Sequence, residues 1–105
     1  MTVTTVANRD VHVDHEGFLT EYTEWDESLA VELAKAIGID ELSEDHWRTI
    51  KFLREDYVTQ GETPTLRRVS VVGGIPTKLL FTLFPSKPAK KMAYVAGLPK
   101  PVGCV

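Results

Sequence analysis

Residues 63–97 read TPTLRRVSVVGGIPTKLLFTLFPSKPAKKMAYVAG. Proline and glycine divide this stretch into short pieces, because proline suits the first helical position and glycine closes a helix. The pattern predicts three short helices: from Pro64 to about Val72, from Pro76 through Leu83, and from Ala89 to Ala96. Short helices joined by tight turns cannot run as a long parallel bundle. We therefore expect them to cross at steep angles in an orthogonal helical bundle.

The residues before this stretch predict two longer helices and a hairpin. Apolar residues recur at helical spacing from Asp26 to Ile37. Ser43 is a good N-cap for a second helix, and Gly61 is placed to end it. β-branched residues between Val3 and Val13 predict a small hairpin at the N-terminus. The predicted fold class is mainly α, with an N-terminal β-hairpin and an extended C-terminal arm.

The chain has 105 residues, enough for one modest core, so we predict a single domain. We expect residues 1–96 to form a globular body and residues 97–105 to form a mobile C-terminal arm. Pro99 and Pro101 stiffen this arm, and Gly97 and Gly103 are its predicted hinges. No apolar run reaches the roughly 20 residues that a membrane-spanning helix needs, so we expect no membrane partner.

The chain has one cysteine, Cys104, and it is the penultimate residue. A structural cysteine normally lies inside an apolar element, whereas this thiol is placed to reach another molecule. A lone cysteine cannot form an internal disulfide, and a free thiol fits a reducing compartment. We therefore expect a cytoplasmic protein with Cys104 as its reactive group. Since an ordinary thiol has a pKa of about 8.5, we expect full activation only inside a partner.

Charge is distributed unevenly along the chain. All 15 acidic residues lie between Asp10 and Glu62, and residues 63–105 contain seven bases and no acid. Such a difference indicates a surface that recognises anions or acidic partners, or two halves that neutralise each other on folding. Both interpretations stay open. The predicted docking residues are the bases Arg67, Lys87, Lys90, Lys91 and Lys100.

The sequence offers weak evidence for metal or cofactor sites. His12, Asp14 and His15 cluster near the end of the predicted hairpin, but solvated turn residues explain them better than a metal site does. The aromatic residues of the helical region are expected to belong to the core rather than to a cofactor site; they are Trp25, Trp47, Phe52 and Tyr57. We predict no metal ligands and no cofactor.

The two short helices around Gly73-Gly74-Ile75-Pro76 also resemble a helix-turn-helix. In that interpretation Arg67, Arg68 and Lys78 face nucleic-acid phosphates. The pattern has low specificity, because many small helical domains contain such a pair without touching DNA. We therefore favour a purely structural helix pair, and direct nucleic-acid binding stays an alternative.

Several motifs together carry a family resemblance that covers nearly the whole chain. The most specific is the ending AGLPKPVGCV at residues 96–105, preceded by LFPSKPAK at residues 83–90. Supporting matches are EGFL at 16–19, WDE at 25–27, DHW at 45–47, FLR at 52–54, Pro64 and Arg67. The chain resembles the DsrC/TusE (TusE/DsrC/DsvC) family of sulfur relay proteins.

The resemblance implies a helical fold with a small N-terminal hairpin and a mobile arm. It also implies that Cys104 accepts sulfur as a persulfide and passes it on, as a component of a sulfurtransferase system. DsrC members carry a second cysteine eleven positions upstream, where this chain has Ala93. The implied function is therefore that of a single-thiol, TusE-like carrier, as in relay toward 2-thiouridine in tRNA or in related sulfur metabolism.

The implied partners are proteins that donate and accept sulfur. The donor would be a TusBCD- or DsrEFH-like complex, and the acceptor a tRNA thiouridylase or a sulfite reductase-like enzyme. The ending Gly103-Cys104-Val105 is also of the kind seen in DsrC members. One alternative is therefore an accessory gamma-type subunit of dissimilatory sulfite reductase. A DNA-binding regulator is the second alternative.

Overall fold

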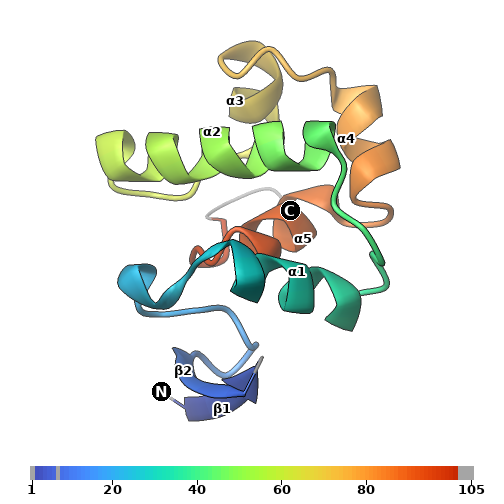
Figure 1. Ribbon diagram of the computed structural model, residues 1–105. Helices are drawn as coiled ribbons and strands as arrows, with labels where there is room; N and C mark the ends of the chain where they lie inside the picture. The colour runs from blue at the N-terminus through green and yellow to red at the C-terminus, as the bar shows by residue number, and fades with distance from the viewer. Residues whose placement is uncertain (1, 7, 102–105) are drawn as a thin grey trace.

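A computed structural model describes residues 2–6 and 8–101, and Figure 1 shows the arrangement. In these two ranges the chain forms five α-helices, one short 3₁₀ helix and a two-stranded antiparallel sheet. The predicted mainly-α fold with an N-terminal hairpin is confirmed. No helix within the described ranges has the length and apolar character needed to cross a bilayer.

The hairpin consists of β1 (Thr2–Val6) and β2 (Arg9–Val13), with Val6 opposite Arg9. Asn8 adopts a φ of +65°, a left-handed conformation that asparagine tolerates well. The side chains of β2 alternate, so that Val11 and Val13 are buried. They form a small apolar cluster with residues of the first helix, which places the hairpin under that helix.

The first two helices are α1 (Glu27–Ala36) and α2 (Glu44–Gln60). Ser43 caps α2 as predicted, and the ring of His46 accepts a bond from the Ser43 N–H at 3.0 Å. The two residues therefore form a reciprocal capping box, with histidine in the place where glutamate is usual. Gly61 ends α2 with a φ of +77°.

The three short helices of the C-terminal half are α3 (Leu66–Val71), α4 (Thr77–Leu83) and α5 (Pro88–Val95). The prediction was wrong by two residues at the start of α3, because Thr65 rather than Thr63 caps it. Thr65 Oγ1 accepts the N–H of Arg68 at 3.2 Å. Both threonines are suitable caps by residue type, but the hydroxyl of Thr63 donates to Pro99 O instead.

α5 occupies the centre of the molecule and contacts α1, α2 and α4. In Figure 1 it lies between α1 and α2, with α3 on the far side of α2 and α4 beside one end of α2. Met92 and Val95 are fully buried, and so is Phe84 just before this helix. Lys87 is exposed at the N-terminal end of α5, whereas Val95 and Ala96 at its C-terminal end are buried.

Candidate functional site

The predicted reactive thiol Cys104 and the predicted hinge Gly103 lie outside the described residues. The site is therefore built from residues 97–101, called here the arm base. Leu98 and Pro101 are buried, and Pro99 is exposed. The arm base thus packs against the globular body.

A tight turn at Gly97 ends α5 and starts the arm base. The N–H of Gly97 donates to Tyr94 O at 3.2 Å, and the N–H of Leu98 donates to Ala93 O at 3.0 Å. This pair of bonds is the Schellman motif, which needs a left-handed residue; Gly97 has a φ of +70°. A Cβ added at Gly97 would lie 2.3 Å from Cδ1 of Trp25. Glycine is therefore required at position 97 for two reasons, the left-handed backbone and the close approach of Trp25. The role of Gly97 as a hinge stays a prediction.

Three side chains from distant parts of the chain bind backbone carbonyls around this turn. They come from the segment before α1, from α2 and from the loop after α2. The bonds are Trp25 Nε1 to Val95 O at 2.9 Å, Arg54 Nη1 to Ala96 O at 2.7 Å, and Thr63 Oγ1 to Pro99 O at 2.7 Å. These contacts join the arm base to the body, because each satisfies a carbonyl that the end of a helix or a loop leaves free.

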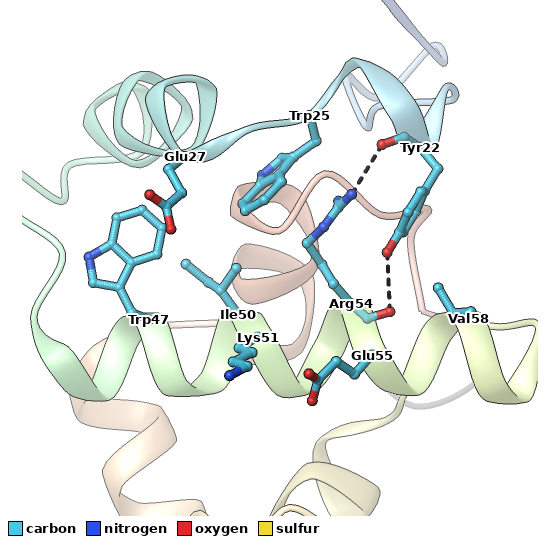
Figure 2. A pocket seen from close by; sticks show the side chains of 9 residues that line it. All are labelled: Tyr22, Trp25, Glu27, Trp47, Ile50, Lys51, Arg54, Glu55 and Val58. Carbon is cyan, nitrogen blue, oxygen red and sulfur yellow. Dashed lines mark hydrogen bonds between the residues drawn. The ribbon is translucent and has the colours of Figure 1, made fainter.

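Arg54 is the centre of this group (Figure 2). Its Cζ lies 3.9 Å from the centroid of the Tyr22 ring and 4.0 Å from that of Trp25. Nη2 donates to Tyr22 O at 3.1 Å. Burial lowers the pKa of Arg54, and the contact with Tyr22 opposes this change. A guanidinium remains charged in proteins, so the site holds a cation between two aromatic faces.

The same residues line a hollow on the surface between α1 and α2, which Figure 2 shows. Trp47 and Glu27 lie at one end of it, and Lys51 and Glu55 lie along α2. The aromatic residues expected in the core are packed against it, as predicted, and Trp25 and Trp47 also reach this hollow. Arg54 lines the hollow, and its guanidinium also binds the carbonyls of Tyr22 and Ala96.

The predicted docking residues do not form one cluster. Lys100 pairs with Glu16 at 3.3 Å, and the Lys91 ammonium donates to Pro85 O. Arg67 and Lys87 line one groove between α3 and α5, and Lys90 does not line it. The structure therefore brings together two of the five predicted residues. The docking role of all five stays a prediction.

Arg68 cannot take the part that a helix-turn-helix would give it. Its Nε and Nη2 donate to the two carboxylate oxygens of Asp56 at 2.7 and 2.8 Å. These hydrogen bonds raise the pKa of Arg68. Together with the pair between Lys100 and Glu16, this contact shows partial neutralisation of the two halves of the chain. Arg67 and Lys78 are exposed and form no ion pair with any residue that the structure describes.

The histidines of the hairpin region have ordinary structural partners. The His12 ring donates to Glu24 Oε2 at 2.8 Å, and the carboxylate of Asp14 accepts two N–H groups of the following turn. The hydrogen bond with Glu24 raises the pKa of His12. Within residues 2–6 and 8–101 no three histidine, cysteine or acidic side chains are grouped to hold a metal ion.

Sequence reasoning missed the three residues that bind the end of α5 and the arm base. Trp25 and Arg54 were assigned only to packing and to family motifs, and Thr63 to helix capping. The bond of Arg54 to Ala96 O spans 42 residues, and the bond of Thr63 to Pro99 O spans 36 residues. No local pattern reports such pairings, although an arginine amid the apolar residues of a helix signals a buried acceptor.

Three comparisons with known proteins agree. The family model described as DsrC-like protein matches residues 5–105. The chain is 40% identical to sulfurtransferase TusE of Salmonella paratyphi A, with 92% of this chain and 94% of that protein covered. It is 36% identical to the gamma subunit of the dissimilatory-type sulfite reductase of Nitratidesulfovibrio vulgaris, with 100% of both covered.

The fold leads to the same group of proteins. The structure superimposes on a chain of the crystal structure of dissimilatory sulfite reductase I with a TM-score of 0.85. That chain is 36% identical, and the match covers 99% of this chain and 100% of that one. The resemblance noted in the sequence is confirmed, and the chain belongs to the DsrC-like family, which includes the TusE and DsrC sulfur relay proteins.

Proposed function

We propose that this protein is a sulfur relay protein that carries sulfur as a persulfide on Cys104. The observation that carries the proposal is the full-length match to the DsrC-like family together with a single cysteine near the chain end. The packed arm base supports it, because residues 97–101 connect the cysteine to a rigid helix end. The proposal needs no metal and no cofactor.

The transfer step is a thiol exchange. The Cys104 thiolate attacks the outer sulfur of a donor persulfide, a new S–S bond forms at Cys104, and the S–S bond of the donor breaks. The donor leaves as a thiolate, so the step involves no net oxidation and consumes no further reagent. In the second step an acceptor thiolate attacks the outer sulfur on Cys104, and the sulfur passes to the acceptor.

Ala93 favours a single-thiol carrier over a two-thiol redox cycle. This residue stands where two-cysteine relatives have their second thiol, and its side chain is fully buried. An intramolecular disulfide with Cys104 therefore cannot form. The 40% identity to a TusE sulfurtransferase is consistent with the same choice.

The proposed partners follow from the family resemblance. We propose a donor complex of the TusBCD or DsrEFH type and an acceptor of the tRNA thiouridylase type. We also propose a cytoplasmic location, because a free carrier thiol needs a reducing compartment. In this scheme the chain delivers sulfur and the acceptor performs the final chemistry.

The arm base defines two reaches for the thiol. While residues up to Pro101 stay packed, Cys104 lies three residues further along, at most about 10 Å away. If the contacts of Arg54 and Thr63 open, the free segment starts at Gly97 and spans at most about 23–25 Å. We propose that a partner with a deep active site opens the arm base.

The test is mass spectrometry of the intact protein after incubation with a persulfide donor, such as a cysteine desulfurase relay. We expect a gain of one sulfur mass that a second thiol removes. Cys104→Ser should abolish the gain, and Lys100→Ala, which leaves the thiol in place, should retain it. Sulfur on the Cys104→Ser variant, or none on the wild type, would contradict the proposal.

A second candidate is an accessory subunit of a sulfite reductase. It is supported by the 36% identity to a gamma subunit across the full length of both chains. The candidate predicts a stable complex with a sulfite reductase-like enzyme. Size-exclusion chromatography of the two proteins together distinguishes it, since a transient carrier would elute alone.

A further inference from the structure

A groove at the opposite end of α5 from the arm base has no assigned role. It lies where the first turn of α3, the outer face of α4 and the start of α5 meet. We call it the α3–α5 groove, and its main lining residues are Leu66, Arg67, Phe81, Lys87, Pro88 and Ala89. It is separate from the hollow around Arg54, because the two share no residue.

The lining of the groove is largely apolar and accessible. Phe81 is 50% exposed, although it is a large aromatic residue on a short helix. A second hollow shares Thr65 and Arg67 with the groove and extends it to Val71 and Val72, which are 71% and 56% exposed. Contiguous exposed apolar surface of this kind marks an interaction site on a small protein.

Positive charge surrounds this apolar surface. Arg67 and Lys87 are exposed at the groove and make no ion pair with any residue in ranges 2–6 and 8–101. No residue after Glu62 is acidic, so the chain around the groove supplies no carboxylate from its own half. A partner surface that carries carboxylates would complement this charge.

The turn that presents Lys87 is conformationally unusual. Ser86 and Lys87 adopt φ values of +59° and +50°, which residues with a side chain disfavour. Lys87 occupies the N-cap position of α5 without a capping bond from its side chain. Its ammonium is therefore held beside the groove rather than used in folding the helix. Strained residues of this kind concentrate at sites where function requires them.

A protein segment fits this surface better than a nucleic acid does. Nucleic-acid affinity comes from several cations that contact phosphates, and here Arg68 is already bound to Asp56. The floor between Arg67 and Lys87 is apolar, with Leu66 and Phe81 in it. An apolar floor between cations matches an apolar side chain between carboxylates.

We infer that the α3–α5 groove docks an acidic amphipathic segment of a partner protein, with a large apolar side chain seated on Leu66 and Phe81. Arg67 and Lys87 pair with carboxylates on either side of that side chain. The inference rests on the proposed function only in taking the partner to be a member of the sulfur relay. Docking at one end of α5 leaves the arm base at its other end uncovered by this contact.

Three synthetic peptides of equal length test the inference by titration into the ¹⁵N-labelled full chain. The first alternates leucine and phenylalanine with glutamate at helical spacing, the second has lysine for glutamate, and the third has serine for the apolar residues. We expect the first to bind and to shift the amide signals of Leu66, Phe81 and Ala89. Arg67→Glu should weaken the binding of the first peptide about tenfold, which corresponds to about 1.4 kcal/mol of binding free energy.

Lys78→Glu is the matched control, since Lys78 is also an exposed base on a short helix and does not line the groove. It should leave the affinity unchanged, and Phe81→Ala should weaken binding with the fold intact by circular dichroism. Binding of none of the peptides, equal binding of the first two, or shifts confined to other surfaces would overturn the inference. So would duplex DNA or tRNA that displaces the acidic peptide from the same amides. None of these readouts involves Cys104, so failure here is separate from failure of the proposed function.

Discussion

The two ends of α5 differ in whether polar side chains around them form hydrogen bonds within the chain. At the C-terminal end, Trp25 and Arg54 donate hydrogen bonds to the last carbonyls of the helix and its cap. At the N-terminal end, Lys87 is exposed beside an apolar groove, with no capping bond and no described ion partner. One end is closed by contacts within the chain, and the other is open to a partner.

This difference shows how a carrier of 105 residues can combine a fixed support with an interaction surface. The central helix is buried along most of its length, and its close packing fixes the position of one end relative to the other. The closed end holds the start of the arm, and the open end offers the surface for recognition. Substitutions at each end should therefore separate stability from binding.

The largest effect is expected for Gly97→Ala at the closed end. Alanine disfavours a φ of +70° by about 1 kcal/mol, and its Cβ would overlap Trp25 at a cost of about 1–3 kcal/mol more. We expect a melting temperature lower by about 10 °C or more. Differential scanning calorimetry measures it.

Gly74→Ala provides the matched control for that substitution. Gly74 has the same φ of +70°, but no atom lies within 4 Å of an added Cβ. Only the conformational cost of about 1 kcal/mol remains. Equal losses for the two variants would show that Trp25 does not restrict the turn.

Arg54→Met tests the cation between Tyr22 and Trp25. The substitution keeps an apolar side chain but removes the donors to Ala96 O and Tyr22 O. We expect the free energy of unfolding to fall by about 2–3 kcal/mol, measured by urea denaturation. Arg48→Met on the same helix should change it by less than about 0.5 kcal/mol, because the pair that Arg48 makes with Asp45 is exposed to solvent. A loss as small as that of the control would contradict the anchoring role.

Thr63→Val removes one hydroxyl and preserves the shape of the side chain. Pro99 O then loses its donor, and we expect a loss of about 1 kcal/mol. Hydrogen exchange at Leu98 and Lys100 should become faster, since the arm base opens more often. Thr59→Val, whose hydroxyl bonds an exposed carbonyl within α2, should leave that exchange unchanged. Unchanged exchange in Thr63→Val would mean that this bond does not hold the arm base.

The smallest effect concerns pH and should leave both ends of α5 unaffected. The hydrogen bond to Glu24 raises the pKa of His12 above 6.5. The stability from this pair is therefore complete below about pH 6.5 and is lost as the pH rises through the folded-state pKa. The melting temperature of the wild type should approach that of His12→Gln over this interval. His15→Gln should follow the wild type, and a His12 NMR titration at an ordinary pKa would contradict the assignment.

Local chemistry made much of the fold predictable from the sequence. Ser43 and Gly61 mark the two ends of α2, and Pro88 and Gly97 mark those of α5. These ends were predictable because capping and left-handed turns depend on residues a few positions apart. The family ending around Cys104 was equally readable, since a thiol carrier needs few residues in a short segment. The start of α3 was misplaced because Thr63 and Thr65 are equivalent as local caps.

The sequence alone thus predicted the helices and the hairpin, and it showed the uneven charge and the single cysteine, because these features depend on the type and order of neighbouring residues. Folding in three dimensions selected which polar groups meet. It placed Arg54 on Ala96 O and Thr63 on Pro99 O, and it paired Arg68 with Asp56. It also set Arg67 and Lys87 beside an apolar groove, where neither has an ion partner among the described residues. These pairings join residues far apart in the sequence. They arise because burial obliges each carbonyl and charge to find a partner within the packed body.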